Sequence, residues 1–206
     1  GWQNVTIRKI CDRIGYTAPV IYQYFDSKEK LLQSLREEGF RLVFEQFELV
    51  DKKHTIPEIR LMKYANVWWV FSKNNPEIYQ VMFNLQGALC ENNENNQSKM
   101  VVNYYNLAFA QISKRAKRSE KFRLELCDNI ISIIHGFISM RMVNKNKSKN
   151  EHIDVVFKNS LHRFLHSIKD ESIISSFLSL QIAILVLASL NIFELEEIFT
   201  EFAELA

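Results

Sequence analysis

The sequence predicts an all-α protein. Only five Gly and three Pro occur in 206 residues, so turns are few and helices should be long. Apolar residues recur at the spacing of one helical face along most of the chain, and no segment keeps the alternation of a strand. Apolar residues make up 47% of the chain and charged residues 24%, which is typical of a globular protein. We therefore expect helices packed around a buried core.

The first helix is expected over residues 5–14. Four of its residues follow the spacing i, i+3, i+4, i+7 of a single buried face, and these are Ile7, Ile10, Cys11 and Ile14. Thr6 is placed to cap the start of this helix. Gly15 is expected to end it, because glycine adopts positive φ without a steric cost.

Two more helices follow within a few residues. Thr17 can cap a short helix over 18–25, in which Pro19 is tolerated because it falls in the first turn. Ser27 can cap a third helix that starts at Lys28. Ile21 and Phe25 lie four residues apart on the face that we assign to the core. Two short helices joined by a tight glycine turn form a helix-turn-helix arrangement.

Beyond these, the apolar periodicity predicts a series of longer helices. Polar or proline-containing breaks separate them, and the run at 91–96 (ENNENN) is too polar to be buried. The expected helices are the third helix continued to about residue 50, then 57–73, 76–90, 98–117, 120–144 and 151–169, followed by a final apolar segment at 172–206.

The first 32 residues carry a resemblance. Residues 6–17 (TIRKICDRIGYT), 20–25 (VIYQYF) and 27–32 (SKEKLL) follow the pattern T-x-x-x-I-A, G-[VY]-[ST], Y-x-[HY]-F and S-K-E-x-L. In this pattern the chain resembles the DNA-binding head of the tetracycline repressor (TetR) family. Cys11 stands where the family usually has Ala, and both are small residues that can be buried. Residues 75–83 and 134–137 look like segments of the ligand-binding region in one branch of that family.

The resemblance implies three parts of the chain. Residues 1–45 would form the helix-turn-helix DNA-binding domain, residues 46–169 a helical ligand-binding and dimerisation domain, and residues 170–206 an extra helical segment. Family members begin with a helix that packs across the helix-turn-helix, whereas this chain starts at the Gly1-Trp2 pair that follows that helix. Residues 184–193 (ILVLASLNIF) look like such a helix, so the C-terminal segment either supplies the missing helix or packs as an extra helix on the body.

The short helix at 18–24 is expected to enter the major groove of double-stranded operator DNA. Pro19 and Val20 would contact thymine methyl groups beside Ala18, and Gln23 would bind adenine. The residues expected at phosphates are Thr6, Thr17, Tyr22, Tyr24 and Lys28, with Arg8 at a phosphate or a flanking position. The alternative is that Tyr22 and Tyr24 are surface or half-buried aromatic residues and that Lys28 is a solvated lysine.

Two heads are needed for useful specificity, so the body is expected to form a homodimer. The helices near 120–144 and 151–169 are the candidates for pairing as a four-helix bundle. Their apolar residues available for this are Ile130, Ile131, Ile134, Phe137, Ile138, Met142, Val156, Leu161, Phe164 and Leu165.

Aromatic residues are concentrated in the middle helices, where they fill a core or line a pocket. The resemblance implies a pocket for a small apolar or aromatic effector that releases a repressor from its operator. The residues expected to line it are Trp68, Tyr79, Met82, Phe83, Tyr105, Phe109 and Phe137, with Asn103 or His135 as a polar contact. His135 is alternatively a structural residue beside a close helix contact at Gly136.

Other classes of protein find less support. The sequence has no Gly-rich phosphate loop, no HExxH, no G-x-S-x-G and no cluster of Cys and His ligands, so neither an enzyme, a metal site nor a cofactor is expected. His162 and His166 lie four residues apart but lack a third ligand. The basic run at 114–118 is interpreted as a solvated helix end.

Three widely spaced cysteines, Cys11, Cys90 and Cys127, favour a reducing cytoplasm. The uncharged stretch at 172–193 is long enough to span a bilayer, which leaves a membrane-associated helical protein as the alternative.

Overall fold

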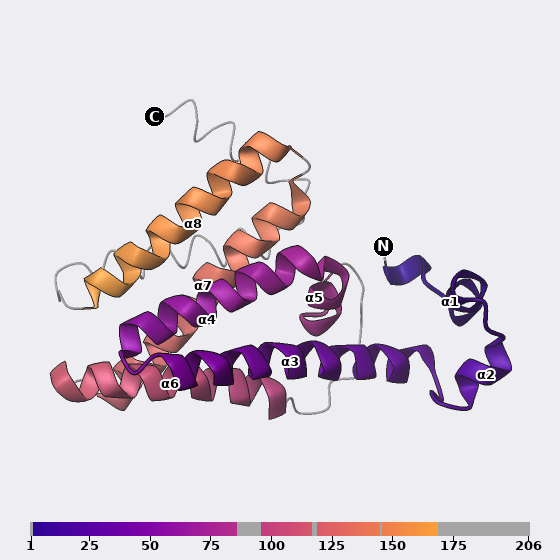
Figure 1. Cartoon of the computed structure of the whole chain (residues 1–206), viewed down its shortest axis with the longest axis horizontal. Helices are drawn as coiled ribbons and strands as arrows, with labels where there is room; N and C mark the ends of the chain where they lie inside the picture. Colours follow the sequence, from indigo (N-terminus) through magenta and orange to yellow (C-terminus); the bar gives the residue numbers. More distant parts are fainter. Residues whose placement is uncertain (1, 86–95, 117–118, 145, 169–206) are drawn as a thin grey trace. The chain divides into compact units, whose positions relative to one another are not determined.

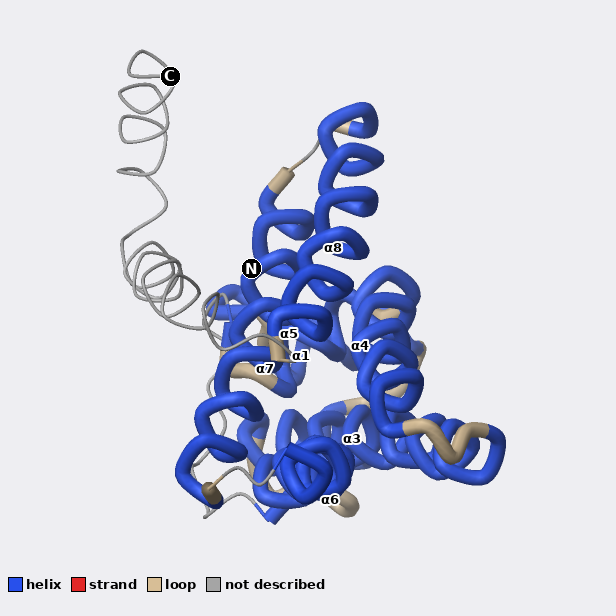
Figure 2. The backbone as a smooth tube through the Cα atoms, turned by 90° about the vertical axis from the view of Figure 1, so that its left-hand side faces the viewer, coloured by secondary structure: helices blue, strands red, loops and turns tan. Residues whose placement is uncertain are grey.

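The computed structural model describes residues 2–85, 96–116, 119–144 and 146–168. Within these ranges the chain is helical and contains no strand (Figures 1 and 2), which confirms the predicted class. A 3-10 turn, η1 (Trp2–Asn4), precedes the helices α1 (Ile7–Ile14), α2 (Ala18–Tyr22), α3 (Lys28–Lys53), α4 (Pro57–Asn74), α5 (Pro76–Met82), α6 (Asn96–Ala116), α7 (Glu120–Val143) and α8 (Lys147–Ser167).

Side-chain caps start several of these helices, as the sequence predicted at two positions. The hydroxyl of Thr6 accepts a hydrogen bond from the backbone N–H of Lys9 at 3.3 Å, and that of Ser27 accepts one from Lys30 at 3.2 Å. These bonds satisfy N–H groups that have no partner inside the helix. Thr17 occupies the N-cap position of α2, as predicted, but its side chain makes no capping hydrogen bond.

Four helix boundaries differ by three residues or more from the predicted ones. Helix α2 ends at Tyr22 instead of near residue 25. Helix α3 continues to Lys53, three residues beyond its expected end near residue 50. Helix α5 ends at Met82 instead of near residue 90, and Asn84 then adopts a positive φ of 53°, a conformation that ends helices. Helix α8 begins at Lys147, because the Asn146 side chain accepts hydrogen bonds from two backbone N–H groups of its first turn.

The chain forms two compact units, residues 1–107 and residues 108–206. In the first unit, α3 packs against α4 and α5, and α1 packs against α2. Its core is rich in aromatic rings: Phe40 lies 6.2 Å from Trp68 and 5.9 Å from Phe83, measured between ring centroids. Phe47 lies 4.4 Å from Tyr64 in the same way. Contacts between aromatic rings at these distances hold α3 against the neighbouring helices.

A close helix contact occurs where α3 crosses α5. Gly39 is buried, and a Cβ atom built on it would lie 2.5 Å from the Sδ of Met82 and 2.8 Å from the Cγ2 of Ile78. Only glycine therefore leaves enough room for α5 at this distance. The sequence showed Gly39 inside a long helical pattern but did not indicate this contact.

In the second unit, α7 and α8 lie side by side in both views. The rings of Phe137 and Phe157 lie 5.8 Å apart across this pair. The Nε of Arg141 donates to the Oδ1 of Asp154 at 3.0 Å, which adds a partly buried ion pair to the apolar contact. The two helices thus form a tightly packed hairpin.

Helix α7 is also, by length and composition, the one helix in the described ranges that could cross a membrane, with a mean hydropathy of 1.3. Core helices of soluble proteins share these properties, and 39% of its apolar window is buried in the structure. The stretch at 172–193, which prompted the membrane alternative, lies outside the described residues, as does the segment at 184–193.

Candidate nucleic-acid interface

The N-terminal head is built around a small apolar cluster. Ile7 and Cys11 on α1 and Ile21 on α2 are buried together, and partly buried apolar residues pack against them, namely Ile10, Ala18, Phe25 and Leu31. The predicted core positions Ile21 and Phe25 are confirmed. Ile14 was expected on the same buried face but is 50% exposed, because it is the last residue of α1 and lies beyond the reach of α2.

The turn between α1 and α2 depends on Gly15. Its φ of 75° places it in the left-handed region, and its N–H donates to the Cys11 carbonyl at 2.9 Å. The next N–H, that of Tyr16, also donates to this carbonyl at 3.2 Å. The glycine thus ends α1 as predicted and directs the chain into α2.

The outer surface of the head carries most of the predicted DNA contacts. Tyr22 is 52% exposed and Tyr24 76% exposed, and Gln23 lies between them at the end of α2. The other predicted residues are exposed at Thr6, Arg8, Thr17 and Pro19 and partly buried at Ala18, Val20 and Lys28. Because α1 packs on the buried face of α2, the side chains of Pro19, Tyr22 and Gln23 are exposed to solvent.

Tyr16 belongs to the same surface and was not among the predicted contacts. It is exposed and directly follows Gly15, in the turn that leads to α2. Tyr16 occupies the second position of the family pattern G-[VY]-[ST], and this position was the signal that could have added it to the predicted contacts.

The charge of the head is modestly positive. Residues 1–35 contain five basic and three acidic side chains. One of the acidic groups, Glu29, lies in the first turn of α3. A hydrogen bond from its own backbone N–H and a weaker contribution from a hydrogen bond with the Ser27 side chain lower the pKa of its carboxyl. A polyanion would therefore be attracted more by the placement of the cations than by their number.

Lys28 also has a structural contact. Its Nζ donates to the backbone carbonyl of Trp2 at 2.9 Å. An ammonium group has three N–H donors, so this bond leaves capacity for a phosphate. Lys28 thus joins the start of α3 to the N-terminal turn η1.

Trp2 connects the head to the body of the first unit. Its indole ring packs against the buried pair Leu32 and Val81, together with Leu35. Its Nε1 donates to the Oε1 of Gln80 on α5 at 3.1 Å. The position of the head therefore depends on α5 as well as on α3, a dependence that sequence reasoning missed.

The comparisons with known proteins agree with this geometry. Residues 1–35 match the sequence model of the bacterial regulatory proteins of the tetR family. The N-terminal part of the chain is thus similar to the DNA-binding head of the tetR family. The matched residues contain η1, α1, α2 and the start of α3, so the surface described above lies within the part of the chain that matches the family model.

The fold of the chain is similar to that in the crystal structure of a protein described as regulatory, SCO4313. The TM-score is 0.61 at 15% sequence identity, and the likeness covers 78% of this chain and 85% of the other. At this identity the likeness concerns the fold. No curated protein matches the sequence.

Four of the predicted effector contacts come together in the first unit. Trp68, Tyr79 and Phe83 are mutual neighbours, with ring centroids 6.3, 5.5 and 4.8 Å apart, and Met82 is fully buried on the same short helix as Tyr79. Tyr105 lies in the same unit, 6.1 Å from Phe47.

The remaining predicted contacts are placed differently. Asn103 is exposed on α6. Phe109, His135 and Phe137 belong to the second unit, where Phe109 contacts Phe164 at 6.4 Å. Although His135 is only partly buried as a residue, desolvation of its ring lowers its pKa to about 4, which keeps the imidazole neutral at physiological pH.

A hollow of about 400 Å³ opens on the first unit between α3 and α4. Its lining consists of Leu42, Gln46, Asn66, Val67, Val70, Phe71, Asn74 and Asn75. None of the residues predicted to contact an effector lines this hollow. In the described part of the chain, no three His, Cys, Asp or Glu side chains are grouped closely enough to hold a metal ion.

The apolar residues expected to pair two copies are mostly used within one chain. Ile130, Ile134 and Ile138 on α7 are buried, as are Leu161, Phe164 and Leu165 on α8. The large apolar residues that α7 and α8 leave exposed are others, namely Leu124, Met140, Val143 and Val155. The side chains of the basic run at 114–118 lie outside the described part.

Proposed function

We propose that this protein is a ligand-responsive transcriptional repressor of the TetR type that binds operator DNA as a homodimer in the cytoplasm. The observation that carries the proposal is the exposed surface at the end of α2, where Tyr22, Gln23 and Tyr24 project from a head that is held rigid by its own apolar cluster. A helix of this kind fits the major groove, whose width admits one helix.

Within the groove, Gln23 is the residue that would identify a base. A glutamine amide can donate to and accept from adenine at the same time, which no other base pair reproduces. Pro19 and Val20 would contact thymine methyl groups beside Ala18. Thr6, Arg8, Thr17, Tyr22, Tyr24 and Lys28 would bind phosphates, which fixes register without specifying sequence.

A homodimer would place two heads at half-sites about one helical turn apart. We assign the pairing to α7 and α8, near residues 120–144 and 151–169. Their exposed apolar residues Met140, Val143 and Val155 are available for this contact, because they are not used in the core of the single chain.

An effector would act through the aromatic core of the first unit. Trp68, Tyr79 and Phe83 surround the end of α5, which also holds Trp2 through Gln80. A small apolar or aromatic effector that prefers a different position of α5 would shift the population of head positions and weaken operator binding.

The test is to select duplexes from a random pool with the purified protein and measure binding of the selected site by fluorescence anisotropy. We expect the logarithm of affinity to fall linearly with the logarithm of salt concentration, because bound phosphates release counterions. Gln23→Ala should lose about tenfold or more in discrimination at one base pair, and Tyr24→Phe should weaken all duplexes alike. Gln46→Ala, on the exposed face of α3, is the control. Affinity that ignores salt, or specificity that survives Gln23→Ala, would contradict the proposal.

A further inference from the structure

One charged residue occupies the buried face of α3. The buried residues of this helix are Leu32, Arg36, Gly39, Phe40, Val43, Phe44 and Phe47, spaced as a single helical face. Arg36 is 7% exposed within this face. An apolar residue is expected at such a position, since arginine is almost never fully buried unless it is paired.

Within the described part of the chain, Arg36 has no such partner. Its Nε atom is fully buried and has no hydrogen-bond partner, and no ion pair in the described part of the chain involves this guanidinium. Its carbon Cζ lies 6.0 Å from the centre of the Phe40 ring, a favourable but weak contact.

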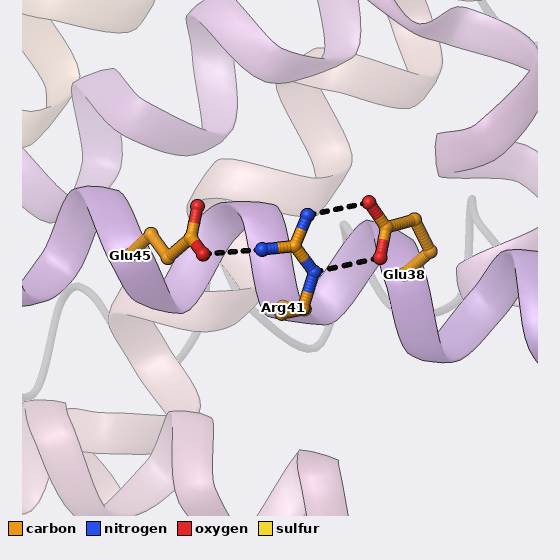
Figure 3. A network of polar contacts seen from close by, with 3 residues as sticks. All are labelled: Glu38, Arg41 and Glu45. Atoms are coloured by element: carbon orange, nitrogen blue, oxygen red, sulfur yellow. Dashed lines mark hydrogen bonds and ion pairs between the residues drawn. The ribbon is translucent and has the colours of Figure 1, made fainter.

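Another arginine of the same helix shows the contrast. Arg41 is exposed, and Figure 3 shows its guanidinium between Glu38 and Glu45. Those bonds raise the pKa of Arg41 and lower that of Glu38. The helix therefore supplies carboxylates to the arginine that water already solvates, and none to the arginine that is buried.

A guanidinium whose Nε is buried without a partner and that has no counter-charge is costly, and part of this cost is recovered when an anion binds it. The fork of N–H donors on arginine matches a carboxylate in geometry. The surroundings indicate what this carboxylate would be attached to. Phe40 lies edge-on to Trp68 and Phe83, so a group beside Arg36 adjoins the aromatic core of the first unit.

We propose that Arg36 binds the carboxylate of the effector, so that the effector class is a small aromatic carboxylic acid. The inference rests on the proposed function, in that it names the ligand of the same aromatic core. Arg36 holds the charged end, and the rings around Phe40 contact the apolar end.

Thermal unfolding of the full chain tests this with two pairs of probes, benzoate against benzamide and salicylate against salicylamide. Each pair shares its ring and differs in charge. We expect the acids to raise the Tm of the wild-type protein by about 3 to 6 °C at ten times their Kd, and the amides to leave it unchanged. An amide that stabilises as well as its acid would overturn the proposal.

Arg36→Met removes the charge and keeps the length of the side chain. Replacing a buried charge by an apolar residue is often neutral or stabilising, so this variant should fold with an equal or higher Tm and lose the response to the acids. Arg36→Lys keeps the charge and should keep part of the response, and Arg41→Met should keep all of it. An Arg36→Met protein that still responds would refute the assignment.

Two further measurements distinguish a failure of the Arg36 proposal from a failure of the proposed function. If inorganic phosphate stabilises the protein as well as benzoate does, and loses this effect in Arg36→Met, the carboxylate class is wrong. Binding of the wild-type protein to its selected duplex is measured alongside. A protein that binds duplex without any response to the acids refutes the Arg36 proposal alone, and one that responds through Arg36 but binds no duplex refutes the regulator proposal instead.

Discussion

The indole Nε1 of Trp2 and the amide oxygen of Gln80 lie 3.1 Å apart and form a hydrogen bond between residues that are 78 positions apart in the chain. The bond joins the turn before the DNA-binding head to α5, the helix that contributes Tyr79 to the aromatic core. Trp2 is held on its other side by Lys28, whose Nζ donates to the Trp2 carbonyl. The head is therefore attached to the body through both α3 and α5.

A double-mutant cycle measures this attachment. Trp2→Phe keeps an aromatic ring and removes the N–H donor, and Gln80→Leu removes the acceptor. We expect a coupling free energy of about 1 kcal/mol between the two changes, the usual net value of one hydrogen bond. The free energy of unfolding is obtained from urea titrations of the wild-type protein and the three variants. Strict additivity of the two changes would show that the bond contributes nothing.

The structure of the head was largely predictable from the sequence, because its determinants are local. The caps at Thr6 and Ser27 and the stop at Gly15 each act within a few residues. Thr17 has the same type of side chain as Thr6 but makes no capping bond. Local sequence therefore identified where helices start more reliably than it identified which bonds form.

The contacts that join distant segments could not be predicted in this way. Periodicity showed that α7 and α8 carry apolar faces. An apolar face that packs within its own chain and one that remains exposed have the same sequence pattern. Ile130 and Phe164 are buried within the chain, whereas Met140 is exposed. Arg36 was overlooked for a related reason, since a charge inside an apolar pattern becomes informative only when its burial is known.

Gly39 allows a second prediction. Gly39→Ala gains about 1 kcal/mol in helix propensity, but its new methyl group would overlap Met82, which is fully buried, and Ile78. We expect a net destabilisation of about 1 to 2 kcal/mol, since overpacking a core forces neighbouring groups to move. Urea unfolding measures it. Ser34→Ala, at an exposed position of α3, is the control and should not destabilise the protein by a comparable amount.

The double variant Gly39→Ala with Met82→Ala checks the cause. Because Met82→Ala removes the sulfur that the new methyl group would meet, the two changes together should cost clearly less than the sum of their separate costs. A sum that is simply additive would assign the effect of Gly39→Ala to something other than this contact.

Gly15 gives a prediction of the opposite kind, because space is not limiting there. No atom lies within 4 Å of a Cβ built on Gly15, so a side chain would cost only backbone strain at φ 75°. Gly15→Ala should destabilise the head by about 1 kcal/mol. Gly15→Asn should cost less, because asparagine tolerates the left-handed region better. Amide hydrogen exchange of α1 reports both effects, and equal exchange in the two variants would contradict this explanation.

His135 makes the stability of the protein depend on pH in a defined direction. Desolvation lowers the pKa of its imidazole from 6.5 to about 4 in the folded state. Between these two values the unfolded chain binds a proton that the folded chain does not, so the free energy of unfolding decreases as pH falls from 6.5 to 4. A shift of this size corresponds to a loss of about 3 kcal/mol, which is complete below pH 4 and absent above pH 6.5.

His135→Asn removes the titrating group and isolates this contribution from the carboxylates that also titrate in acid. We expect the stability of the wild-type protein, relative to the variant, to fall by up to about 3 kcal/mol between pH 6.5 and pH 4. His162→Asn, an exposed histidine on α8, provides the matched comparison. Parallel pH profiles for the wild-type and His135→Asn proteins would show that the imidazole is solvated, and that its protonation does not oppose folding.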